Sequence, residues 1–146
     1  MIPITVFLIL ALDQLTKFLI TENLALHESI PVVNGIFSLT LIHNRGAAFG
    51  IFKNQLYLFV FVSLVTICLI FFVLKNNRSN RLYSFSLSLV LGGALGNLID
   101  RVFLGYVVDF LDFHIWPVFN VADSAITCGT FILGWLIIKP NKKYAS

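Results

Sequence analysis

Four long apolar stretches constrain this chain more than any other feature of its sequence. They cover about residues 2–20, 55–74, 82–101 and 121–138. An α-helix rises about 1.5 Å per residue, so each stretch is long enough to cross a hydrocarbon layer about 30 Å thick. Lipid offers the backbone no hydrogen-bond partners, and such segments therefore form helices. We predict a mainly α, polytopic membrane protein with four transmembrane helices.

The composition supports this fold class. Of the 146 residues, 58% are hydrophobic and only 12% are charged, and the mean hydropathy is +0.92, which excludes an ordinary soluble domain of this length. We treat residues 1–146 as a single membrane domain. The first stretch lacks a basic leading segment and a small-residue cleavage site, and Asp13 interrupts it, so we expect a retained span rather than a cleaved signal.

Basic residues are concentrated beside one end of the predicted bundle. Six of the ten lie in the segment between the second and third stretches or in the C-terminal tail: Lys75, Arg78, Arg81, Lys139, Lys142 and Lys143. The positive-inside rule then predicts that these segments and both termini are cytoplasmic. Their charge meets anionic lipid, so it does not indicate a nucleic-acid partner. All seven acidic residues fall in the outer half or outside, and we expect any site near the outer face.

The segment between the first two stretches, about residues 21–54, has mixed polarity. Asn34 and Gly35 separate two runs of β-branched and apolar residues, which predicts a small extracytoplasmic β-hairpin near residues 31–43. The following sequence NRGAAFG places Arg45 where the chain re-enters the membrane. Its side chain could contact a ligand or extend to lipid headgroups, and the sequence leaves both interpretations open.

Polar residues gather where the third stretch ends and the fourth begins. Asn97, Asp100 and Arg101 share one helical face at the end of the third. Asn120 and Asp123 begin the fourth, where they could form a variant capping box at the positive end of the helix dipole. Capping alone is a sufficient explanation for Asp123, but it leaves the other aspartates unexplained.

Asp109 lies among apolar residues in the short outer link between these two stretches, which places it near Asp123. Two carboxylates in a partly dry site do not both ionise readily, so one of them keeps a proton. Such a pair can activate water and protonate a carbonyl, as in aspartic proteases. Asp112 is a rival to Asp109, and we interpret it as a solvated loop acid.

No other group of residues suggests a competing chemistry. Ser124 has no suitably placed His and Asp, and we expect no metal and no other cofactor because the three histidines lack metal-ligand spacing: His27, His43 and His114. An alternative function is a small transporter or proton-relay protein that uses the outer acids. A transporter would be expected to carry acids on the inner side too. A third possibility is a noncatalytic lipid-binding or assembly protein.

Five sequence blocks in order extend over essentially the whole chain: DQLTK (13–17), NRGAAFG (44–50), GGALGNLIDR (92–101), GYVVDF (105–110) and FNVADS (119–124). This pattern resembles the bacterial lipoprotein signal peptidase family, the type II signal peptidases. The resemblance implies an aspartyl endopeptidase of the bacterial cytoplasmic (inner) membrane. Its partners would be membrane lipids and diacylglyceryl-modified prolipoproteins, whose signal peptides it removes by cutting just before the lipidated cysteine. We expect it to act as a monomer.

The resemblance also assigns individual residues. Asp109 and Asp123 match the family's catalytic pair. The residues that match substrate-binding or dyad-supporting positions are Asn44, Arg45, Asn97, Arg101, Asn120, Asp13 and Lys17.

Physical arguments add three expectations. Asp123, near a helix N-terminus, is interpreted as the ionised base and Asp109 as the protonated acid. Asp13 and Lys17, four residues apart, are interpreted as a mutually neutralising pair. The segment between Asp109 and Asp123 is shorter than is usual in the family, which leaves open whether it forms the family's amphipathic surface helix.

Overall fold

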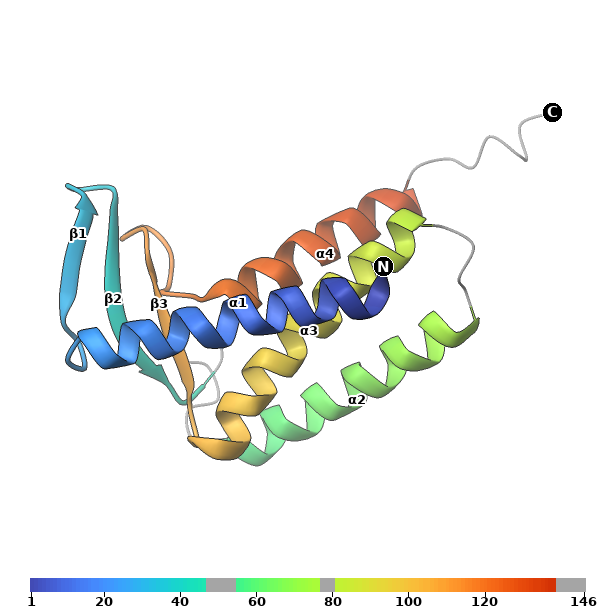
Figure 1. Ribbon diagram of the computed structural model, residues 1–146, viewed down its shortest axis with the longest axis horizontal. Helices are drawn as coiled ribbons and strands as arrows, with labels where there is room; N and C mark the ends of the chain where they lie inside the picture. The colour runs from blue at the N-terminus through green and yellow to red at the C-terminus, as the bar shows by residue number, and fades with distance from the viewer. Residues whose placement is uncertain (47–54, 77–80, 139–146) are drawn as a thin grey trace.

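The computed structural model describes residues 1–46, 55–76 and 81–138. In chain order the elements are α1 (Ile2–Asn23), β1 (Ser29–Val33), β2 (Phe37–Asn44), α2 (Leu56–Asn76), α3 (Arg81–Phe103), β3 (Val107–Asp112) and α4 (Val121–Ile138). The helices form a bundle with the small sheet at one end (Figure 1). All four are long and apolar enough to cross a membrane, which confirms the predicted class.

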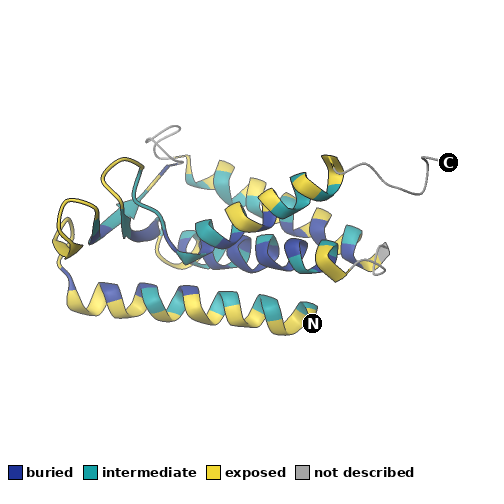
Figure 2. Cartoon of the chain, turned by 90° about the horizontal axis from the view of Figure 1, so that it is seen from above, coloured by how far each residue is buried: buried dark blue, intermediate teal, exposed yellow. Residues whose placement is uncertain are grey.

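Helix α3 is the centre of the bundle. Of its most apolar stretch 67% is buried by the rest of the protein, against 11% for α1, 11% for α2 and 17% for α4. Figure 2 shows the buried residues gathered along the middle of the bundle and the exposed residues on its outer faces. Small residues on α3 permit this close packing. A Cβ atom at Gly93, for example, would collide with the backbone carbonyl of Ala122 on α4.

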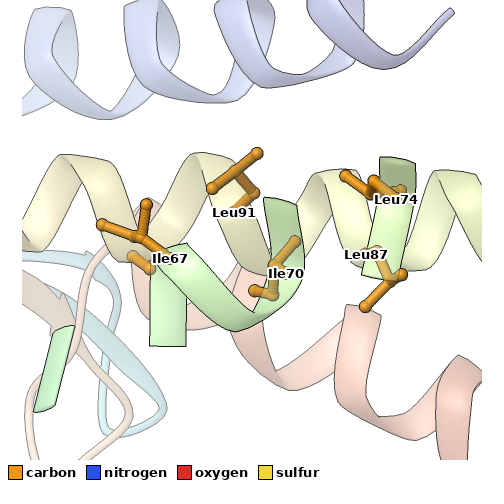
Figure 3. Close-up of a cluster of buried hydrophobic side chains, with 6 residues drawn as sticks. Ile67, Ile70, Leu74, Leu87 and Leu91 are labelled. Atoms are coloured by element: carbon orange, nitrogen blue, oxygen red, sulfur yellow. The ribbon is translucent and has the colours of Figure 1, made fainter. Parts of the chain in front are cut away.

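The half of the bundle away from the sheet has an apolar core. Ile67, Ile70 and Leu74 of α2 pack against Leu87 and Leu91 of α3 (Figure 3). Lipid tails are as apolar as these side chains, so the exclusion of water does not stabilise this contact. Close van der Waals packing stabilises it instead.

The sheet has three antiparallel strands in the order β1-β2-β3. The predicted hairpin is confirmed: the N–H of Ile36 donates to the carbonyl of Val33 at 3.0 Å, and Gly35 takes a φ of 73° in the turn. The expectation that the β-element lies only between α1 and α2 was incomplete. Its third strand comes from the link between α3 and α4, whose run of β-branched and apolar residues pairs with β2 instead of forming a plain loop.

Two local features fix the ends of β3. Gly105, with a φ of 80°, ends the turn that follows α3 and lets the chain reverse into the strand. After β3 the chain folds back, and the N–H of Phe119 donates to the carbonyl of Leu111 at 3.1 Å. Residues 113–120 contain no helix, so the surface helix that the sequence left open is absent from this segment. This return places the start of α4 beside the middle of β3.

Candidate active site

Asp109 occupies a buried position on β3, opposite Ile42 of β2, with only 1% of its surface exposed. Its two carboxylate oxygens accept hydrogen bonds from two asparagine amides. Asn44 Nδ2, at the end of β2, donates to Oδ2 at 2.9 Å, and Asn120 Nδ2 donates to Oδ1 at 2.7 Å. The side chain is therefore held in one orientation by neutral donors from both sides.

Asp123 lies in the first turn of α4 and forms the capping box that the sequence suggested. The N–H of Asp123 donates to Asn120 Oδ1 at 2.9 Å, and the N–H of Asn120 donates to Asp123 Oδ2 at 3.4 Å. The other carboxylate oxygen accepts a hydrogen bond from Asn97 Nδ2 of α3 at 2.7 Å. Capping therefore uses one oxygen of Asp123, and its carboxylate also faces the third helix.

Asn97 and Asn120 connect the two aspartates. Asn120 Nδ2 lies 3.1 Å from Asn97 Oδ1 and 3.2 Å from the carbonyl of Val108, in addition to its contact with Asp109. Its two amide hydrogens thus serve three acceptors. Because Asn120 contacts both aspartates, Asn97 holds Asp123, and the two asparagines contact each other, they form a bridge between Asp109 and Asp123.

Both aspartates line one cavity of about 270 Å³ at the sheet end of the bundle. Its polar wall also includes Asn44, Asn97 and Arg101. Its apolar lining includes Trp116, Pro117, Val118, Phe119 and Ile126. Two larger hollows, of about 850 and 490 Å³, have mainly apolar linings that include neither aspartate. Of these three hollows in the described residues, we place the candidate site in the smallest, because it combines apolar lining residues with the two carboxylates.

The surroundings of Asp109 favour its protonated form. Burial, with the nearby charge of Asp123 as the second cause, raises the pKa of Asp109 to about 7 from an ordinary 3.8. Arg101 is close enough to interact electrostatically with both aspartates, and its guanidinium lies 5.2 Å from the ring centroid of Phe59. In the described ranges, however, no Lys, Arg or His forms an ion pair with Asp109 or Asp123.

Beside this site lies a buried charge cluster, defined by Asp13, Lys17 and Asp100, which we call the brace cluster. Lys17 Nζ lies 2.8 Å from Asp13 and 2.9 Å from Asp100, and it donates to Asn97 Oδ1 at 3.0 Å. The predicted Asp13–Lys17 pair is confirmed. The contact of Asp100 with Lys17 was not predicted, nor was its contact with Gln14, whose Nε2 donates to Asp100 at 3.0 Å, because helical spacing gives partners within a helix and not across two helices.

Two residues considered in the sequence analysis, Arg45 and Asp112, lie outside both the cavity and the brace cluster. Arg45 follows β2, is exposed, and does not line the cavity. Asp112 is not a solvated loop acid: it ends β3, accepts a hydrogen bond from Thr40 Oγ1 at 2.8 Å, and lies 3.4 Å from the ring of His114. It lies three positions after Asp109 and does not line the cavity, because successive side chains of a strand point to opposite faces of the sheet.

The profile of the family described as signal peptidase II matches residues 5–139. The chain belongs to the signal peptidase II family. Among its relatives are the lipoprotein signal peptidases of Moorella thermoacetica, 50% identical over 91% of this chain and 89% of that protein, and of Halothermothrix orenii, 46% identical over 91% and 92%.

Solved structures agree with this membership in the signal peptidase II family. Two bacterial membrane enzymes, determined by the in meso method at 2.3 Å and 1.9 Å resolution, superpose with TM-scores of 0.91 and 0.89. They are 30% and 29% identical in sequence, and the matches cover 94% and 96% of this chain and 87% and 94% of theirs. The four-helix arrangement and the small sheet are therefore features of known enzymes of the membrane.

Proposed function

We propose that this peptidase-family chain is an aspartic endopeptidase that removes signal peptides from diacylglyceryl-modified prolipoproteins, cutting just before the lipidated cysteine. The observation that carries the proposal is the pair Asp109 and Asp123. Their carboxylates line one cavity and are joined by the hydrogen-bonded pair Asn97 and Asn120. The names of the relatives, lipoprotein signal peptidases, supply the substrate class.

In the first half of the reaction, the oxygen of a water molecule attacks the scissile carbonyl carbon. The ionised carboxylate of Asp123 accepts a proton from that water. Asp109 donates its proton to the carbonyl oxygen, which gives a neutral tetrahedral diol. A raised pKa suits Asp109 to this role because the carboxyl keeps its proton near neutral pH. The neutral donors Asn44 and Asn120 orient it without adding charge.

In the second half, Asp109 takes a proton back from one diol hydroxyl while Asp123 gives its proton to the leaving nitrogen. The carbon–nitrogen bond breaks, and both carboxyls return to their starting states, so the cycle balances without a metal ion. The apolar wall of the cavity fits the lipid-bearing part of a substrate. The guanidinium of Arg101 can hold an oxygen of the substrate's carbonyl or lipid.

The membrane setting is part of the proposal. We propose the bacterial inner membrane, both termini cytoplasmic and the cavity near the outer face, because Lys75 and Arg81 mark the opposite end of the bundle from the sheet. The tail lysines and Arg78, which contributed to this prediction, lie outside the described residues.

The test is cleavage of a diacylglyceryl-modified prolipopeptide by purified protein in lipid nanodiscs, with products identified by mass. The unchanged chain is expected to cut just before the lipidated cysteine, and Asp109→Asn and Asp123→Asn are expected to stop cleavage. Asp112→Asn is the matched control, because it removes an acid from the same strand outside the cavity.

The outcomes separate the possible functions. Activity that survives in a folded Asp109→Asn or Asp123→Asn variant contradicts the dyad. Complete inactivity of the unchanged chain on lipidated and unlipidated peptides contradicts the peptidase, and the transporter or lipid-binding functions would then be tested by ion flux and lipid binding.

A further inference from the structure

The brace cluster contacts the backbone immediately before each aspartate. Asp100 Oδ2 accepts a hydrogen bond from the N–H of Val108 at 3.0 Å, and Val108 precedes Asp109. Asp13 Oδ1 accepts one from the N–H of Ala122 at 2.8 Å, and Ala122 precedes Asp123. The same arrangement therefore occurs twice, with a buried carboxylate at each position.

One ammonium group joins these two carboxylates. Lys17 Nζ lies 2.8 Å from Asp13 and 2.9 Å from Asp100, and all three side chains are buried. Its third contact, with Asn97 Oδ1 at 3.0 Å, reaches the amide that holds Asp123. The ammonium thus connects the backbone of β3, the backbone of α4 and the side chain of Asp123.

Neither amide has the partner that its own element would normally supply. Val108 lies on β3, an edge strand in the order β1-β2-β3, and N–H groups on the outer side of an edge strand lack a strand partner. Ala122 lies in the first turn of α4, where helix N–H groups have no acceptor within the helix. In both places the acceptor comes from another helix, α3 for Val108 and α1 for Ala122, and Lys17 joins the two acceptors.

From these contacts we propose that Asp13 and Asp100 are positioning residues, held by Lys17, which fix the backbones of Val108 and Ala122 and so set the separation of Asp109 and Asp123. The proposal rests on the proposed function, because it gives the dyad a spacing device. Apart from the cluster, β3 and α4 are joined by residues 113–120, by the backbone bonds of Phe119 to β3, and by the contacts of Asn120 with both aspartates. A misplacement of about 1 Å at reacting groups can lower a rate about a hundredfold.

The main test compares Asp100→Leu with Asp100→Asn in the full chain, with lipidated prolipopeptide as substrate. Asp100→Leu removes the acceptor for the N–H of Val108, and kcat is expected to fall about tenfold to a hundredfold with KM within about twofold. Asp100→Asn keeps an acceptor oxygen, and kcat is expected to recover to within about fivefold of the unchanged chain. This rescue and the split between kcat and KM are not expected from loss of folded protein alone.

Leu91→Ala is the matched control for stability. Leu91 lies on the same helix and in the apolar core, with 2% of its surface exposed. The variant is expected to unfold at a lower temperature while kcat per folded molecule stays unchanged. A loss of kcat in Leu91→Ala equal to that in Asp100→Leu would overturn the positioning role, and so would an unchanged kcat in folded Asp100→Leu.

Gly96→Ala tests the same proposal if Asp100→Leu does not fold. A Cβ at Gly96 would lie 2.5 Å from Asp13 Oδ2, so the added methyl displaces Asp13 while every charged group remains. A lower kcat with a similar KM supports the brace cluster, and an unchanged kcat overturns it. Failure of the unchanged chain to cleave would contradict the proposed function, whereas cleavage that is insensitive to all of these variants contradicts the positioning role alone.

Discussion

Two pairs of carboxylates lie at the sheet end of this bundle, and they differ in what surrounds them. Asp13 and Asp100 share the ammonium of Lys17, with contacts of 2.8 and 2.9 Å. Asp109 and Asp123 accept hydrogen bonds from asparagine amides and, in the part of the chain that the structure describes, form no ion pair. The first pair shares one contacting counter-ion, and among the described residues the second pair has no contacting counter-ion.

This difference separates a structural role from a chemical one. A carboxylate in contact with a buried ammonium is held in place by that contact, and it can in turn fix a backbone amide. A carboxylate among neutral amides keeps a proton more readily and can release it to a substrate. Four aspartates in one small region can therefore have two functions, which depend on the position of a single lysine.

The largest expected effect comes from neutralising the second pair. Asp109→Asn and Asp123→Asn are each expected to lower kcat by about 10² to 10⁴-fold, because each removes a group that transfers a proton. The melting temperature should stay the same or rise, since a buried carboxylate without a counter-ion is replaced by a neutral amide. Cleavage assays and thermal unfolding of the same preparations would check both statements. A variant that loses stability and activity together would contradict the division of roles.

Removal of the lysine should have the reverse pattern, with stability as the main loss. Lys17→Met leaves Asp13 and Asp100 buried without their shared counter-ion, and breaking a buried ion pair costs about 3–5 kcal/mol. Denaturant unfolding in detergent would measure this change in free energy. Lys75→Met, at the exposed far end of α2, is the control and is expected to stay within about 0.5 kcal/mol of the unchanged chain. Equal stabilities for the two variants would show that the brace cluster holds nothing.

The pH dependence should distinguish the two pairs as well. Asp109, with a pKa of about 7, is expected to lose its proton above neutral pH, and kcat should then fall about tenfold per pH unit. Its folded pKa is above the ordinary 3.8, so the folded chain binds more protons than the unfolded chain between these values. The stability contribution of Asp109 therefore decreases as the pH rises from about 4 to about 7.

Kcat and melting temperature recorded from pH 4 to 9 would check this prediction. Asp109→Asn is expected to flatten the corresponding part of the stability profile. A kcat that keeps rising through pH 8 would contradict the assignment of the proton to Asp109.

The sequence was sufficient for the features that depend on local pattern. Hydrophobic length predicted all four helices, Asn34-Gly35 predicted the hairpin turn, and the four-residue spacing of Asp13 and Lys17 predicted their contact. Each of these depends on residues close together in the chain. A short stretch of sequence is enough to predict these features, because a helix or a turn is formed mainly by its own residues.

Long-range contacts were the part that residue patterns could not give. Strand β3 exists because it pairs with β2, and Asn44 reaches Asp109 only through that pairing. Asp100 was recognised as part of a polar helix face, but its contacts with Lys17 and the N–H of Val108 cross between elements. The likeness to a family indicated Asn44 and Lys17 without the geometry. Arg45 is exposed, and its role stays a prediction.

Asp112 gives the smallest expected effect and a direct check on the comparison. It is a further acid on the same strand as Asp109, but it accepts a hydrogen bond from Thr40 and lies beside His114. Asp112→Asn keeps one acceptor oxygen, so the free energy of unfolding is expected to change by less than about 1 kcal/mol. Kcat should change by less than about twofold, because Asp112 neither lines the cavity nor contacts the asparagine bridge. Parallel cleavage assays with Asp109→Asn would measure the contrast. A large loss of kcat in Asp112→Asn would mean that acidity near β3, rather than the two aspartates joined by Asn97 and Asn120, determines activity.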